Sequence, residues 1–250
     1  MSGHSKWANI KHKKDAADKV KGKAFSRIGK EIMVAAKMGG GDPNSNPRLR
    51  SALTAAKAVN MPNANIDRAI KKGLGELGDV TFEEIVYEGY AAGGVAVMVD
   101  CLTDNRNRSI SDVRQVFDRN GGNLAGSGAV ARMFPRQAHF VISGEWADED
   151  KLMDLVLDAG ANDLTVEDGE AEIWADPEYF EGLVKLFEEK GIPTDSAEVV
   201  RKPEMTVELT DAKVAAQVLR LVDRMEELDD VQMVTANYEI ADAIADEIEE

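Results

Sequence analysis

The sequence contains very few of the residues that form disulfides or hold zinc. Its 250 residues include one cysteine, Cys101, and three scattered histidines, His4, His12 and His139. A single cysteine excludes an internal disulfide and is typical of a reducing compartment, and the histidine spacing matches no zinc site. We therefore expect a cytoplasmic protein with no metal and no cofactor.

Long hydrophobic runs are also missing. No apolar stretch approaches the ~20 residues that a membrane-spanning helix needs, and the first residues lack the apolar core of a secretory signal. The composition, 44% hydrophobic and 30% charged, is typical of a globular protein and excludes a wholly disordered chain. We expect no contact with a membrane.

Basic residues are scarce overall but are concentrated at the N-terminus. The whole chain has 30 Lys and Arg against 46 Asp and Glu, a net charge of −16, which argues against binding to phosphates. Residues 1–75 nevertheless hold 16 basic and 5 acidic residues, a charge of +11, and residues 76–250 carry −27. The first 75 residues are therefore the expected place for a nucleic-acid contact, and we call them the basic head.

The basic head has the periodicity of helices. Apolar residues recur at spacings of three and four over 15–38, a second helix is predicted to begin at Asn46-Pro47, and a third spans about 65–72. Three helices with short connections predict a small bundle.

Beyond Gly78 the apolar period changes to two, which indicates strands. The predicted order up to residue 134 is strand, strand, helix, strand, at 81–87, 95–102, 109–119 and 129–134. Residues 135–203 have the order βαββαβ of a ferredoxin-like unit, with strands at 139–143, 164–167, 171–175 and 198–201 and helices at 148–159 and 177–190. A strand, a helix and a strand follow at 205–209, 211–228 and 231–236.

The last three of these elements cannot form a domain alone, so we expect them to complete the sheet begun at 81–134. The predicted fold is α+β, with an N-terminal three-helix bundle and two ferredoxin-like α/β domains, the third domain inserted into the second. The expected domains are 1–78, then 79–134 plus 204–238, then 135–203, with an acidic tail at 239–250.

Lysines interleaved with an aromatic residue make the basic head the first candidate site. Within residues 6–23 only Asp15 and Asp18 interrupt the run of positive charge, and such a run can neutralise phosphates while an indole stacks on a base. The alternative is a solvated tail that balances an acidic protein. The candidate residues are Lys6, Trp7, Lys11, Lys13, Lys14, Lys19, Lys21, Lys23 and Arg27.

A second candidate is the segment 103–109, which contains Arg106 and Arg108. We expect Ser109 to cap the following helix, with Asp112 completing a capping box. A helix start flanked by arginines can receive a phosphate. The alternative is that Asp104 and the asparagines hold the turn and cap the helix.

Other motifs give little reason to expect chemistry. The run Gly126–Ala131 has the letters of a dinucleotide-binding loop but enters a strand instead of following one. The acidic clusters match solvated faces or helix starts, and Cys101 lies on a core-like strand. We expect no catalytic residues, and the protein is not expected to be an enzyme.

Several long motifs resemble those of the YebC/PmpR family. In the first 78 residues they are Gly3–Lys11, Gly39–Pro43, Asn46–Arg50, Asn60–Pro62 and Ile66–Ile70. Further along they are Tyr87–Tyr90, Gly93–Val95, Leu102–Arg108, Gly121–Leu124, Met133-Phe134 and Asp195–Glu198. Two turns depart from the family pattern, because 89–93 lacks a Gly-Pro pair and 125–128 replaces a more polar sequence.

The resemblance implies a cytoplasmic, three-domain protein that binds nucleic acid. Members of the family are described as DNA-binding transcriptional regulators, and relatives include a mitochondrial translational activator and proteins linked to ribosomes. Three functions stay open: a DNA-binding regulator, which we place first, a translation factor that binds ribosomal RNA or the ribosome, and a protein-binding adaptor. The partner of a regulator would include the transcription machinery, and a homo-oligomer is compatible with all three.

Overall fold

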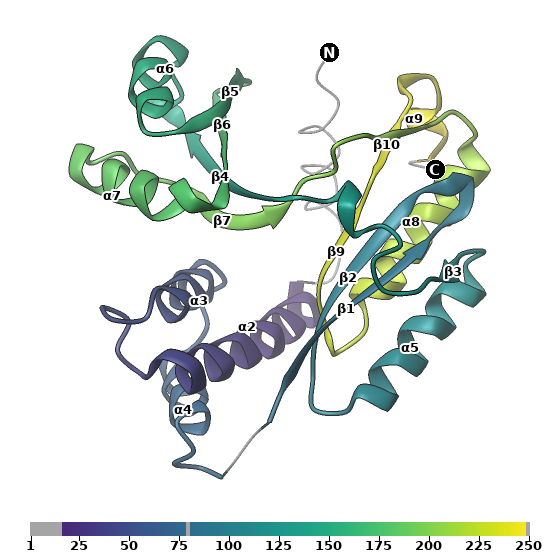
Figure 1. Ribbon diagram of the computed structural model, residues 1–250, viewed down its shortest axis with the longest axis horizontal. Coiled ribbons are helices and arrows are strands. Elements are labelled where there is room, and N and C mark those ends of the chain that lie inside the picture. Colours follow the sequence, from purple (N-terminus) through teal and green to yellow (C-terminus); the bar gives the residue numbers. More distant parts are fainter. Residues whose placement is uncertain (1–16, 79–80, 249–250) are drawn as a thin grey trace. The chain divides into compact units, whose positions relative to one another are not determined.

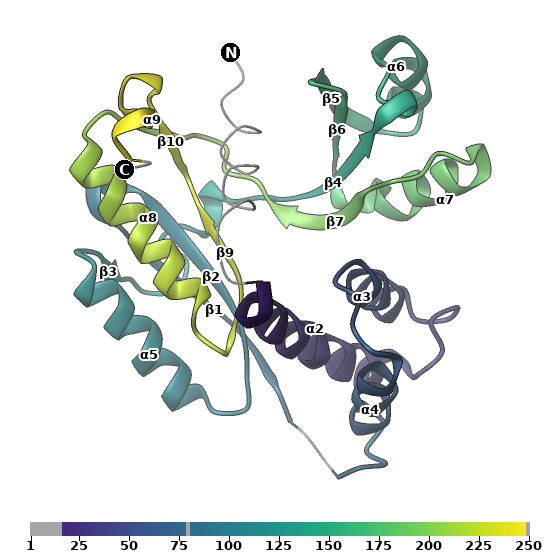
Figure 2. The same cartoon turned by 180° about the vertical axis from the view of Figure 1, so that it is seen from behind.

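The computed structural model describes residues 17–78 and 81–248. These residues form two compact units (Figures 1 and 2). Unit 1 contains the described residues up to Met133 and those from Met205, and unit 2 is Phe134–Glu204. The chain therefore leaves unit 1, folds as unit 2 and returns, in agreement with the predicted insertion.

Unit 1 begins with the three predicted helices, α2 (Ala17–Gly39), α3 (Pro47–Ala58) and α4 (Asn63–Gly73). Both α3 and α4 pack on α2, around a core that includes Ile32, Leu49 and Ile66. Asn46 is the N-cap of α3, because its side chain accepts a hydrogen bond from Leu49 N at 3.1 Å, as the Asn46-Pro47 sequence predicts. Its amide nitrogen also donates to Ala35 O at 2.8 Å, which ties the start of α3 to α2.

The α/β part of unit 1 is a four-stranded sheet with two helices on one face (Figure 1). The strand order is β3-β1-β2-β9, and each neighbouring pair is antiparallel. Residues Val97, Val99 and Cys101 of the central strand pack against α5 and α8. The elements are β1 (Glu83–Tyr90), β2 (Ala96–Thr103), α5 (Arg106–Arg119), β3 (Asn123–Leu124), α8 (Ala212–Glu226) and β9 (Val231–Ala236).

Two predictions for this part of the chain are wrong. The segment 129–134 is not a strand but contains the short 3-10 helix η2 (Ala131–Met133), and the strand after α5 is instead β3. Strand β8 (Val207–Leu209) does not join the main sheet, because it pairs with β10 (Tyr238–Ile240). The expected acidic tail begins with β10 and α9 (Asp242–Ile248), whose buried Ile240 and Ile244 contact the core. The apolar residues Tyr238 and Ile240 alternate as in a strand, and Ile240, Ile244 and Ile248 recur every four residues as in a helix. The many carboxylates between them make these patterns hard to recognise in the sequence.

Unit 2 has the predicted ferredoxin-like topology, with strand order β5-β6-β4-β7. Its strands are β4 (Arg136–Ser143), β5 (Ala161–Glu167), β6 (Glu170–Ala175) and β7 (Ser196–Arg201), and its helices include α6 (Glu149–Asp158) and α7 (Phe180–Lys190). Asp168 and Gly169 both have positive φ, 50° and 82°, as the two-residue hairpin turn between β5 and β6 requires.

Candidate nucleic-acid interface

A row of three cations on α2 lies within hydrogen-bonding reach of the end of α8. Lys23, Arg27 and Lys30 recur at spacings of four and three, so they share one face of the helix. Lys23 Nζ donates to Glu227 O at 2.8 Å, Arg27 Nη2 donates to Glu226 O, and Lys30 Nζ donates to Asp229 O at 2.9 Å. We call these three residues the inner row.

The inner row has a structural reason to contact α8. The last carbonyls of a helix have no partner within the helix and carry the negative end of its dipole, so cations stabilise that end. Burial lowers the pKa of Arg27 more than the nearby Glu226 raises it, but a guanidinium stays charged in proteins. Lys23 and Arg27, predicted to bind nucleic acid, therefore have partners inside unit 1.

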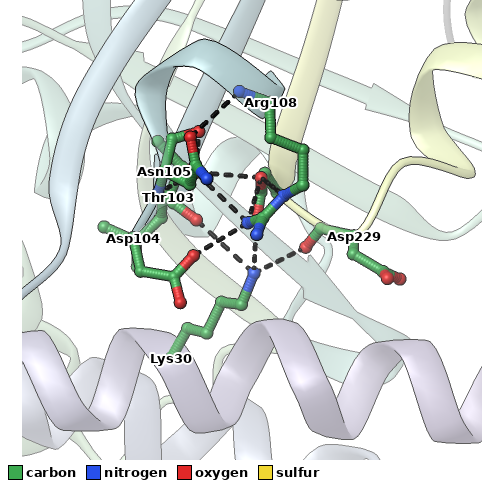
Figure 3. Close-up of polar contacts among 8 residues, drawn as sticks. Lys30, Thr103, Asp104, Asn105, Arg108 and Asp229 are labelled. Carbon is green, nitrogen blue, oxygen red and sulfur yellow. Dashed lines mark hydrogen bonds and ion pairs between the residues drawn. The ribbon is translucent and has the colours of Figure 1, made fainter. Parts of the chain in front are cut away.

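Asp230 is the centre of a second set of contacts, and Figure 3 labels three of the residues that contact it, Lys30, Thr103 and Arg108. Asp230 is only 6% exposed, and its carboxylate accepts hydrogen bonds from Lys30 Nζ at 3.0 Å, Arg108 Nη2 at 2.8 Å and Thr103 Oγ1 at 2.9 Å. Burial alone would raise the pKa of Asp230, but these hydrogen bonds outweigh it and lower the pKa. The carboxylate thus links α2, β2, α5 and the start of β9.

The segment 103–109, which contains Arg106 and Arg108, includes the first turn of helix α5. Helix α5 begins at Arg106, and Asn105 is its N-cap, because Asn105 Oδ1 accepts a hydrogen bond from Arg108 N at 3.1 Å. The prediction that Ser109 caps the helix is wrong, since Ser109 lies inside α5 and is buried. Asn105 and Ser109 are both capping residue types. Thr103 Oγ1 donates to the distant Asp230 and accepts from Asn105 N, which favours the earlier cap.

The two arginines of this segment have different surroundings. Arg108 donates to Asp230 and, at 2.8 Å, to Asp104 Oδ1, so carboxylates already hold its guanidinium. Arg106 is exposed and makes no hydrogen bond or ion pair with another described residue. Of the two predicted phosphate ligands at this place, only Arg106 is therefore available in the structure.

Exposed cations lie instead on α3 and α4. Lys57, Arg68, Lys71 and Lys72 are exposed and make no ion pair with any carboxylate among the described residues. We call these four residues the outer set. Sequence reasoning missed them, although their positions outside the apolar stripes of two predicted helices were a usable signal.

The remaining predicted residues cannot be placed. Lys6, Trp7, Lys11, Lys13 and Lys14 lie outside the described residues, as do the side chains of Lys19 and Lys21.

The glycine-containing segment before η2 holds a carboxylate of the protein itself. Glu88, 4% exposed, accepts hydrogen bonds from Gly128 N and Val130 N at 2.7 Å and from Ala131 N at 2.9 Å. These amides are the groups that a phosphate would contact in a phosphate-binding loop. The segment is thus a structural turn fixed by Glu88.

A metal site and a reactive thiol are both missing from the described residues. Within 17–78 and 81–248 no group of His, Cys, Asp and Glu is arranged to hold a metal. Cys101 is buried, and burial raises the pKa of its thiol to about 12, so it is not a reactive thiolate. None of the described helices is long and apolar enough to cross a membrane.

Comparisons with known proteins cover nearly the whole chain. The family described as "TACO1/YebC protein N-terminal domain" matches residues 5–76, and "TACO1/YebC second and third domain" matches residues 82–238. A "Probable transcriptional regulatory protein" of Syntrophobacter fumaroxidans is 53% identical over 248 residues, which cover 99% of this chain and 100% of the relative. One from Geobacter sulfurreducens is 51% identical over 241 residues, covering 96% and 97%.

A solved structure has the same fold. The crystal structure of a "Conserved Hypothetical Protein Aq1575" from Aquifex aeolicus superposes with a TM-score of 0.85 at 46% identity, covering 96% of this chain and 99% of that one. The two family matches meet between residues 76 and 82, where the helical region ends and the sheets begin. The chain therefore belongs to the TACO1/YebC family.

Proposed function

We propose that this protein is a transcriptional regulator that binds DNA through its basic head, without catalysing a reaction. Its relatives are named probable transcriptional regulatory proteins, which supports a regulatory role. The partners we infer are nucleic acid and, through it, the transcription machinery, in the cytoplasm.

The observation that carries the proposal is the outer set. Four exposed cations on two short helices, with no carboxylate partner among the described residues, are free to neutralise phosphates. The three cations of the inner row are not free to neutralise phosphates, because their side chains donate hydrogen bonds to backbone carbonyls at the end of α8. Exposed cations held on two packed helices also position the chain on a polyanion.

The test compares two double charge reversals in the full-length protein. We expect Lys71→Glu with Lys72→Glu to weaken binding of duplex DNA about tenfold or more at ~0.1 M salt and to flatten the salt dependence by about one unit of slope for each lost phosphate contact. Fluorescence anisotropy at several salt concentrations measures both quantities.

A matched control uses Lys185→Glu with Lys190→Glu, which makes the same charge change on exposed residues of α7 in unit 2. This pair should change affinity about twofold at most. Equal losses in the two variants would mean that only net charge matters and would contradict a site on α4.

A second function, translation through ribosomal RNA, is favoured by the kind of side chains in the outer set. Three of the four are lysines, which contact phosphates as point charges and carry no base-reading geometry. Shape and phosphate recognition of this kind is common for structured RNA. Co-sedimentation with ribosomes, beside crosslinking of bound DNA and RNA, separates the two, since ribosome occupancy without promoter enrichment would overturn the first proposal.

A further inference from the structure

A pocket of about 380 Å³ lies within unit 1, between α2, the end of α4 and the residues that lead into β1. This volume is at the lower end of the range of about 300–1,000 Å³ that is typical of small-molecule sites. Its lining is largely apolar and includes one aromatic residue. We call it the bundle pocket, and its lining includes Met33, Met38, Gly73, Thr81, Phe82 and Glu84.

Contacts with the helical bundle hold the wall of the bundle pocket that residues 81–84 form. Arg48 of α3 makes ion pairs with both Glu31 of α2 and Glu84, which fixes Glu84 against the bundle. Lys30 Nζ lies 5.9 Å from the centroid of the Phe82 ring, within reach of a cation–π contact, and Lys30 is not one of the lining residues. The wall is therefore in place without a ligand.

Cations of the outer set lie next to the bundle pocket. Lys71 and Lys72 directly precede Gly73, which is part of the lining. Gly73 lies so close to α2 that a Cβ at this position would collide with the carbonyl oxygen of Met33. This end of α4 is thus a fixed edge of the pocket, beside two cations proposed to bind phosphates.

The chemistry of the lining suits a nucleobase. Methionine and phenylalanine side chains contact the flat faces of a base, and the hydroxyl of Thr81 and the carboxylate of Glu84 are hydrogen-bonding groups for its edge. The faces of a base are accessible when it is unpaired, because neighbouring bases cover them in a duplex. The adjacent lysines favour a nucleic acid over an apolar protein segment as the source of the ligand.

We propose that the bundle pocket binds one unpaired base of a single-stranded nucleic acid whose phosphates lie on Lys71 and Lys72. The proposal rests on the proposed function, because the outer set must hold the strand. It adds to that function a contact that a fully paired duplex does not offer.

The test compares labelled strands of about twelve nucleotides that carry the same phosphates with and without bases. Binding to the full-length protein is measured by fluorescence anisotropy at ~0.1 M salt, with DNA and RNA strands each compared with an abasic counterpart. We expect the strand with bases to bind about fivefold more tightly than its abasic counterpart, for at least one of the two sugars. Phe82→Leu should reduce this ratio to less than twofold, because the aromatic ring is lost from the lining.

Two matched controls accompany these measurements. Phe180→Leu makes the same change at another partly buried phenylalanine, on α7 of unit 2, and should leave the ratio unchanged. If Phe82→Leu disturbs folding, Met38→Ala replaces it, since Met38 is 73% exposed, and should lower the ratio about twofold. Met205→Ala, at a methionine that is 71% exposed and outside the pocket lining, should not lower it.

A charge reversal distinguishes failure of this proposal from failure of the proposed function. Lys71→Glu with Lys72→Glu should weaken binding of both strands by the same factor, and unchanged affinity for both would contradict the proposed function. Equal binding of the two strands by the wild-type protein would overturn the base pocket alone. Equal reductions of the ratio in Phe82→Leu and Phe180→Leu would also overturn it, as would tighter binding of an acidic, leucine-rich peptide that depends on Phe82.

Discussion

The inner row and the outer set carry the same kind of charge on the same helical bundle, but their surroundings differ. Lys23, Arg27 and Lys30 donate to backbone carbonyls at the end of α8, and Lys30 also pairs with Asp230. The outer set, on α3 and α4, has no carboxylate partner among the described residues. A count of basic residues therefore predicts a surface that binds a polyanion only when the cations with partners inside the protein are left out of the count.

The strongest way to break this comparison is to remove the carboxylate that pairs with Lys30 of the inner row. Asp230→Ala removes the buried carboxylate that accepts hydrogen bonds from Lys30, Arg108 and Thr103. We expect a loss of about 3 kcal/mol in the free energy of unfolding, since a buried ion pair loses one member. Urea denaturation measures it.

The control for this variant is Asp229→Ala, which changes the neighbouring residue. Asp229 is exposed and contributes its carbonyl oxygen to Lys30, which Asp229→Ala retains. We expect a change within about 0.5 kcal/mol. Similar losses at 229 and 230 would show that the carboxylate of Asp230 is not the stabilising group.

The contribution of Asp230 should also depend on pH. Its pKa is lowered in the folded protein, so the stabilisation is present above the ordinary value of ~3.9 and is lost as the pH falls toward the lower folded value. The difference in unfolding free energy between wild type and Asp230→Asn should be constant from about pH 5 to 7 and shrink below about pH 4. A difference that grows on acidification would contradict the ion-pair assignment.

A third prediction separates stability from binding. Arg27→Gln should lower the free energy of unfolding by about 1 kcal/mol, through the lost hydrogen bond to Glu226 O, and change DNA affinity less than twofold. Lys71→Gln should do the opposite, with unchanged stability and about threefold weaker binding. Thermal melts measure the stability of both variants, and fluorescence anisotropy measures their affinity for DNA. Weaker DNA binding in Arg27→Gln but not in Lys71→Gln would mean that the inner row, and not the outer set, contacts DNA.

The smallest effects are expected at the start of α5. Arg106→Gln should weaken DNA binding about twofold without affecting stability, because its side chain has no described partner. Arg108→Gln should instead reduce stability by about 1 kcal/mol through the lost contacts with Asp104 and Asp230. An Arg106 variant with wild-type affinity would leave this helix start with a structural role only.

Much of the fold follows from patterns that the sequence displays locally. The helices of the basic head, the cap Asn46 and the βαββαβ order of unit 2 all agree with periodicity and turn chemistry. The prediction of a strand at 129–134 is wrong, because its apolar residues Val130 and Phe134 are buried without pairing to another strand.

The candidate site was harder to predict because its partners are distant in sequence. Arg27 and Glu226 are separated by 199 residues, and Arg108 and Asp230 by 122. Nothing in a local window distinguishes such a cation from an exposed one. Asn105 and Ser109 likewise compete as caps, and tertiary contacts of Thr103 decide between them.

The way the chain enters and leaves unit 2 has a consequence for protein engineering. Arg136 at its beginning is paired with Arg201 near its end, and Lys202 N donates to Pro135 O at 3.0 Å. The two crossing points are therefore adjacent, so a few glycine and serine residues suffice to replace everything between them. Such a shortened chain would carry far less negative charge, and the same two cut points would accept an unrelated module whose termini lie close together.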